Sequence, residues 1–263
     1  MSNFFSPARF SRLFIKHSQE HYARYLMSMV VLVGVMVMGG SFLIYMINAS
    51  LDPVFQMLLY AWLLLLGGTI FTSTIFAEYG SSKKVITKLS LPASHFEKYL
   101  VAWLYSFVIL FIMVTVSFYG VMAFLINVKH FPQQRPELFN LLQRPGALQF
   151  PIIFIVLVLY SLLHSIIFYG AIHFKSLHFI KTAFLFFIAI AVMMCGNKLL
   201  YDPLFKKDTI AGLPFTNVAY LEKGRVVVIN LADNKEFYSL MMYMVLAVMF
   251  WIAAYFRLKE KQA

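Results

Sequence analysis

The sequence predicts an all-α, polytopic membrane protein with six transmembrane helices, and three observations support this fold class. Of the 263 residues, 61% are hydrophobic and the mean hydropathy is +0.78, more than an ordinary globular domain can bury. Six apolar runs, separated by polar connections, make up most of the chain. Each run meets the length of about 20 residues that a helix needs to cross a bilayer. The expected spans are residues 26–47, 54–77, 99–126, 151–174, 182–200 and 238–256.

The first 25 residues are expected to form a cytoplasmic amphipathic helix before the first span. Phe10, Leu13 and Phe14 fall on one helical face, whereas Arg9 and Arg12 fall on another. A basic amphipathic helix at such a place can lie in the membrane interface among anionic headgroups. The pattern therefore predicts an interfacial helix, and the alternative is a basic flank that only sets the topology.

The net charge of +11 is distributed as membrane topology requires. Lys and Arg are concentrated in the N-terminal segment, the second and fourth connections and the C-terminal tail, whereas residues 48–53 contain neither. Because short basic loops stay on the cytoplasmic side, both termini are predicted to be cytoplasmic in a protein of the cell (inner) membrane. The same distribution argues against nucleic acid as a partner.

The connection between the second and third spans is the most structured of the predicted loops. Ser81 or Ser82 can cap a short helix, and Pro92 should end that helix. The segment Ser94–Glu97 then reads as a capping box at the start of the third span. The short helix would have an apolar side of Val85, Ile86 and Leu89 and a polar side of Lys83, Lys84 and Lys88. The alternative is an ordinary basic inner loop.

Two outer connections are expected to contain regular structure. Residues 136–144 begin with proline and are followed by Pro-Gly, which predicts a short helix. Residues 217–221 and 225–231 predict a small β-hairpin between the fifth and sixth spans. The single cysteine, Cys195, lies in the fifth run and is expected to be a small packing residue.

The sequence contains none of the common catalytic motifs. It has no phosphate-binding glycine loop, no dinucleotide fingerprint and no H-E-x-x-H motif, and one cysteine cannot build a thiolate zinc cluster. We therefore expect one transmembrane domain over residues 1–263, with no enzymatic activity, metal or cofactor of its own. His164, well inside the fourth run, is a possible pathway residue. The alternative is a neutral histidine hydrogen-bonded across a helix interface.

The order of these parts resembles the permease subunits of ABC type 2 transporters of the exporter class. The shared parts are a basic amphipathic helix, a structured link between the second and third spans, and six spans with an extended outer loop before the last. The local resemblance is strongest in the link, which has a Leu-Pro-Ala-Ser-x-x-Glu-Lys pattern at residues 91–98.

This resemblance implies an ATP-driven exporter. A separate ABC ATP-binding subunit would hold ATP and magnesium, and a second permease copy or a paralogue would complete a dimer. Phe10, Leu13 and Phe14 would belong to the connecting helix, and residues 83–89 would form the coupling helix that contacts the ATPase. The alternative is an integral-membrane enzyme, or an accessory or sensor protein, with active groups in the outer loops. The candidates there are His130, Glu137, Asp202 and Asp208.

Overall fold

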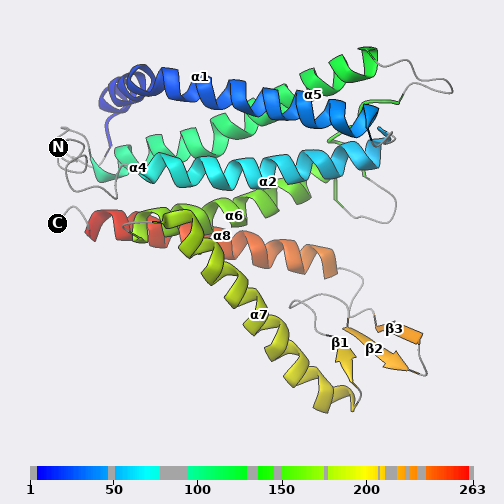
Figure 1. The fold of residues 1–263 in the computed structure, drawn as a ribbon. Coiled ribbons are helices and arrows are strands. Elements are labelled where there is room, and N and C mark those ends of the chain that lie inside the picture. Colours follow the sequence, from blue (N-terminus) through cyan, green and yellow to red (C-terminus); the bar gives the residue numbers. More distant parts are fainter. Residues whose placement is uncertain are drawn as a thin grey trace.

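The structure is a computed structural model that describes residues 5–46, 51–77, 94–128, 136–144, 150–174, 177–206, 208–210, 218–222, 225–229 and 235–260. Within these ranges, six helices are long and apolar enough to cross a membrane. The prediction of a largely helical, multi-pass membrane protein is therefore confirmed. Most of the long helices run side by side, and both chain termini lie at the same end of the bundle, as an even number of spans requires (Figure 1).

Each predicted span coincides with, or lies largely within, one helical span, because an apolar run of about 20 residues is long enough to cross a bilayer as a helix. The helices are α1 (Pro7–Tyr45), α2 (Pro53–Ala77), α4 (His95–Trp103), α5 (Leu110–Val128), α6 (Ile152–His173), α7 (His178–Phe205) and α8 (Lys235–Glu260). A π-helical segment, η2 (Leu104–Ile109), joins α4 to α5, so these three form one continuous span.

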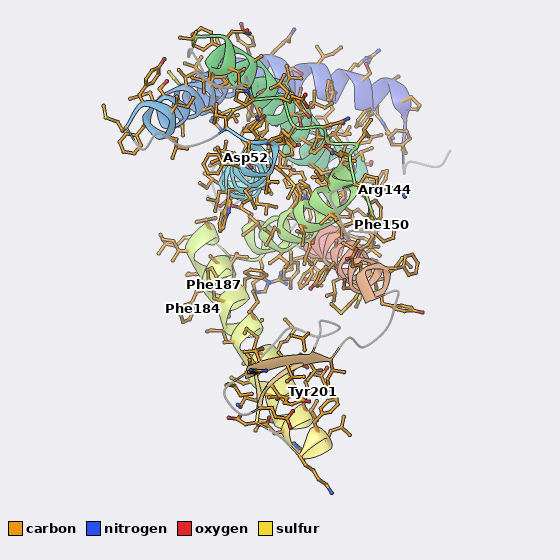
Figure 2. All side chains as sticks on the ribbon, turned by 90° about the vertical axis from the view of Figure 1, so that its right-hand side faces the viewer. Asp52, Arg144, Phe150, Phe184, Phe187 and Tyr201 are labelled. Atoms are coloured by element: carbon orange, nitrogen blue, oxygen red, sulfur yellow. The ribbon has the colours of Figure 1, made fainter. Side chains whose placement is uncertain are left out.

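The predicted N-terminal helix and the first span form one helix in the structure, with no break from Pro7 to Tyr45. Helix α1 is one uninterrupted helix of 39 residues, because residues 8–33 contain no proline or glycine that would end it. It nevertheless changes direction: its first turns lie across the other long helices, and the remainder runs along them (Figures 1 and 2).

A small antiparallel sheet stands beside the far end of α7. Strands β2 (Val218–Glu222) and β3 (Arg225–Ile229) pair from Val218 opposite Ile229 to Glu222 opposite Arg225. This pair confirms the predicted hairpin. A third strand, β1 (Thr209–Ile210), pairs with β2 and was not foreseen. The strand order is β1-β2-β3, so the fold departs from all-α at this point.

The helix predicted for residues 136–144 is wrong, because this segment is irregular, with a turn at residues 141–142. The Gln143 N–H donates to the Asn140 carbonyl within the segment, but the backbone groups of Glu137 and Phe139 bind neighbouring elements. The amide of Gln56 donates to the Glu137 carbonyl at 2.7 Å and accepts from the Phe139 N–H at 3.1 Å. The Tyr119 hydroxyl donates to the Phe139 carbonyl at 2.9 Å. These partners on α2 and α5 satisfy the backbone groups that a helix would otherwise pair internally.

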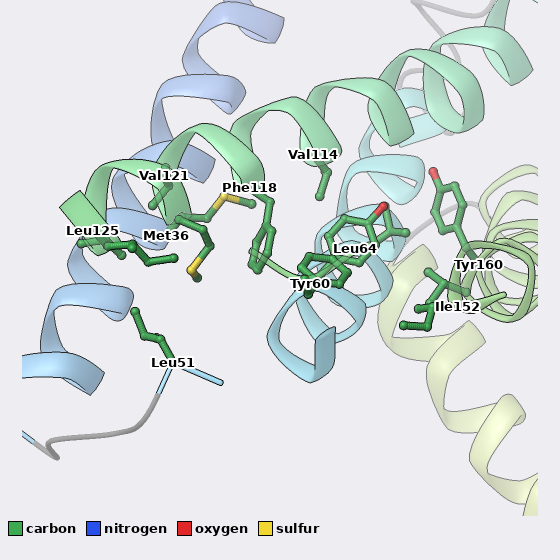
Figure 3. Close-up of a cluster of buried hydrophobic side chains, with 14 of the residues drawn as sticks. Met36, Leu51, Tyr60, Leu64, Val114, Phe118, Val121, Leu125, Ile152 and Tyr160 are labelled. Atoms are coloured by element: carbon green, nitrogen blue, oxygen red, sulfur yellow. The ribbon is translucent and has the colours of Figure 1, made fainter. Parts of the chain in front are cut away.

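Two clusters of buried side chains hold the bundle together. The larger joins α1, α2, α5 and α6 and includes Tyr60, Phe118 and Tyr160. The Tyr60 and Phe118 rings meet with centroids 5.4 Å apart, whereas Tyr160 lies further along the bundle (Figure 3). Close packing is possible because small residues stand opposite large ones: a Cβ on Gly68 would lie 2.5 Å from the Tyr160 ring. The smaller cluster joins α4, η2, α6 and α8 at the end where the termini lie.

Helix α7 is the least packed of the long helices. Thr182 is its only buried residue among the side chains that the structure describes, and α7 leaves the bundle with Phe184 and Phe187 on its open surface (Figure 2). Cys195 is also exposed, so the expectation of a packing role for it is wrong. Apolar side chains around a membrane helix are compatible with contact to lipid.

Candidate functional site

The predicted coupling helix, with Lys83, Lys84, Val85, Ile86, Lys88 and Leu89, lies outside the described residues. The structure does place the elements on either side of it. Helix α2 ends at Ala77 and α4 begins at His95, both at the end of the bundle where the chain termini lie (Figure 1). The first turns of α1 lie at this same end.

The apolar stripe of the N-terminal helix faces protein. Phe10, Leu13 and Phe14 are half-buried and pack against the smaller of the two buried clusters. The ring of Phe14 lies 5.0 Å from that of Tyr105 on η2, measured between centroids. The opposite face of α1 is exposed, with Ile15 at 52%. The stripe that predicts an interfacial helix therefore also fixes α1 onto the bundle.

Polar groups extend the same contact one turn further. The Ser18 hydroxyl is hydrogen-bonded to the Tyr105 hydroxyl, and His17 Nε2 lies 2.6 Å from the Tyr25 hydroxyl. The rings of His17 and His21 stack with centroids 4.4 Å apart. The i, i+4 spacing of the histidines places them on one face, but the sequence gives no sign that the Tyr105 ring would meet that of His17.

Helix α4 starts at the predicted capping box, which the structure confirms. The Ser94 side chain accepts from the Glu97 N–H, and Glu97 Oε2 accepts from the Ser94 N–H at 2.9 Å. The other carboxylate oxygen, Oε1, accepts from the Ser6 N–H at 2.8 Å and lies 3.3 Å from the Arg9 guanidinium. The sequence predicted the first of these roles and not the second, because Ser6 and Glu97 are 91 positions apart.

His164 is fully buried on α6 and joins three helical segments. Its Nδ1 accepts from the Trp251 indole N–H on α8 at 3.1 Å, and its Nε2 lies 2.8 Å from Ser106 Oγ on η2. Because Nδ1 is the acceptor, the neutral ring carries its proton on Nε2 and donates to Ser106. The Ser106 hydroxyl donates in turn to the Ala102 carbonyl at 2.8 Å. Both ring nitrogens have partners, which favours the structural alternative, and the pathway role stays a prediction.

The π-helical segment contributes to the same cluster. The Tyr160 hydroxyl donates to the Ser106 carbonyl at 2.8 Å, and the Phe107 and Tyr160 rings stack with centroids 5.0 Å apart. A π-turn frees carbonyl groups from the regular α-helical ladder, and such turns are frequent at functional sites. Here the freed carbonyl is bound from α6, so η2, α6 and α8 form one hydrogen-bonded unit.

The outer candidates are engaged in local structure. Asp202 accepts from the backbone and the hydroxyl of Thr209, and Lys198 lies between Asp202 and Asp208. These contacts fix the end of α7 to β1. Glu137 contributes its carbonyl to Gln56, and His130 lies outside the described residues. Within the part that the structure describes, no three His, Cys, Asp or Glu side chains are grouped as a metal site would require.

Among known proteins, no family model, no curated sequence and no solved structure matches this chain.

Proposed function

We propose that this chain is the membrane-spanning permease subunit of an ATP-driven exporter of the ABC type 2 class. It would work with a separate ATP-binding subunit and pair with a second permease copy or a paralogue. The proposal rests on the resemblance of the link and of the order of parts, and one structural observation supports it.

That observation is the position of the first turns of α1. Their apolar stripe packs on η2 and α4, at the end of the bundle where α2 ends and α4 begins (Figure 1). The link of residues 78–93 connects the end of α2 to the start of α4. The first turns of α1 and both attachment points of the link therefore lie at the same end of the bundle. An ATPase that docks on the link would therefore be close to two elements that lead into the membrane.

The proposal assigns ATP and magnesium to the partner, because this sequence has no phosphate-binding glycine loop. It also assigns the end with both termini and the link to the cytoplasm, because Lys and Arg are concentrated in those segments. Phe10, Leu13 and Phe14 would be connecting-helix residues. Lys83, Lys84, Val85, Ile86, Lys88 and Leu89 would contact the ATPase.

The test is purification of the tagged chain from its native membrane, followed by identification of co-purifying proteins that contain a Walker motif. We expect the wild-type chain to retain an ATP-binding subunit and Ile86→Asp to lose it, because buried apolar anchors carry most of the energy of an interface. Replacement of the three lysines should weaken retention less and in a salt-dependent manner.

Thr87→Asp is the matched control, since it adds the same charge on the side where helical periodicity places the lysines. It should retain the ATPase at normal membrane abundance. A wild-type chain that retains no ATP-binding subunit would overturn the proposed function. If the Ile86→Asp variant still retains the ATP-binding subunit, the link does not dock the ATPase and is only a basic loop that sets the topology.

A further inference from the structure

The start of α1 is held by a side chain from another helix. Ser6 is the N-cap residue of α1, but its own side chain makes no capping hydrogen bond. The carboxylate of Glu97 accepts the Ser6 N–H instead. The same carboxylate closes the capping box of α4 by accepting the Ser94 N–H. One side chain therefore occupies the N-terminal ends of two helices, where the partial positive charge of both dipoles favours an anion.

This carboxylate is buried and paired. The Glu97 side chain is 0% exposed, and the Arg9 guanidinium lies 3.3 Å from Oε1 with its side chain 37% exposed. A buried charge is stable only when its partners remain in place, and removal of one partner leaves an uncompensated charge. Arg9 and the backbone N–H groups of Ser6 and Ser94 must consequently move together with Glu97. If they moved apart from it, the buried carboxylate would lose its partners.

Aromatic contacts surround the pair and extend it to a third helix. The Phe96 ring meets the Phe5 ring with centroids 6.1 Å apart, and it meets the Tyr255 ring on α8 at the same distance. The first residues of α4 are thus packed between the start of α1 and the end of α8. Ser94 directly follows the link of residues 78–93 in the sequence, so a movement of the link would reach this junction first.

We infer that Arg9 and Glu97 are a positioning pair that makes the start of α1 and the start of α4 move as one body when the link moves. This inference rests on the proposed function, because it assumes that an ATPase acts on the link. Through this pair, the start of α1 would stay attached to α4, the first helix of the span that follows the link. The rest of α1 would then transmit that movement along the bundle.

The test uses the wild-type chain purified with its ATP-binding subunit and reconstituted in liposomes. Arg9→Gln and Glu97→Gln remove the charge pair, and Arg9→Lys retains it. Arg12→Gln is the matched control, because it removes one positive charge from an exposed position of the same helix. Two quantities are measured for each variant: hydrogen exchange of the backbone amides of residues 6–10, of which Pro7 has none, and the rate of ATP hydrolysis by the complex.

We expect exchange in residues 6–10 to become roughly tenfold faster in Arg9→Gln and Glu97→Gln. The rate of ATP hydrolysis should change by roughly fivefold or more, the lower range of coupling between sites. Arg9→Lys and Arg12→Gln should resemble the wild type in both measurements.

Unchanged exchange would show that the pair does not hold α1, and faster exchange with unchanged ATP hydrolysis would show a merely structural role. Either result overturns the inference while the proposed function stands. A wild-type chain that purifies without an ATP-binding subunit overturns the proposed function itself, and the inference with it.

Discussion

Replacement of His164 distinguishes a structural histidine from one that handles protons or substrate. His164→Phe keeps an aromatic ring of similar size but loses the hydrogen bonds to Trp251 and Ser106. His164→Ala loses the same bonds and also the packing of the ring. If the role of His164 is structural, both variants should lower stability in proportion to the contacts removed and retain function at equal abundance.

The contacts allow a magnitude to be assigned to each variant. Hydrogen bonds between membrane helices contribute about 0.6 kcal/mol each on average, so His164→Phe should cost about 1 kcal/mol. His164→Ala additionally empties a site surrounded by aromatic rings, namely Phe107, Tyr160, Phe168 and Trp251. Loss of a buried aromatic ring costs about 3–5 kcal/mol, which gives a total of about 4–6 kcal/mol. At about 2–4 °C per kcal/mol, Tm should fall by about 2–4 °C for Phe and by about 8 °C or more for Ala.

The assay is thermal unfolding of the purified chain in detergent, together with the rate of ATP hydrolysis by the complex at matched membrane abundance. We expect His164→Phe to retain that rate. If His164→Phe keeps its Tm near the wild-type value and yet abolishes ATP hydrolysis, the imidazole has a chemical role and the structural interpretation is refuted.

Two further predictions concern the packing. Gln56→Leu should lower the free energy of unfolding by about 2–4 kcal/mol, because three backbone groups, two of them in buried hydrogen bonds and one in a part-buried one, lose their partner. The control is Asn127→Leu, which removes an exposed amide and should change the free energy of unfolding by no more than about 0.5 kcal/mol. Equal losses of stability for the two variants in denaturant unfolding would contradict the role of Gln56. Gly170→Ala should destabilise the contact between α6 and α7, because the added Cβ would overlap the Thr182 side chain. At Gly196 the added Cβ would meet no other atom, so Gly196→Ala should stabilise α7 by about 0.5–1 kcal/mol. Equal Tm values for the two glycine variants would refute this packing.

The positions of the spans could be predicted because a bilayer turns hydrophobic length directly into helix length. The capping box at Ser94 was also predictable, since its partners are three residues apart. Two of the three partners of Gln56 and the second role of Glu97 depend on residues more than 80 positions away, and a single sequence contains no signal for such pairs. Residues 136–144 show the same difficulty, because proline and Pro-Gly flank helices and turns alike.

The exposure of α7 has a mechanical consequence. The helix meets the bundle at Thr182, which packs on Gly170, and it ends at Phe205 beside the small sheet. At 1.5 Å per residue, the arm from Thr182 to Phe205 is about 35 Å long. With Thr182 as the fulcrum, a tilt of about 10° would displace the far end by about 6 Å, on the order of one helical turn. A small rotation at the α6–α7 contact would therefore produce a much larger displacement at the far end of α7, beside the small sheet.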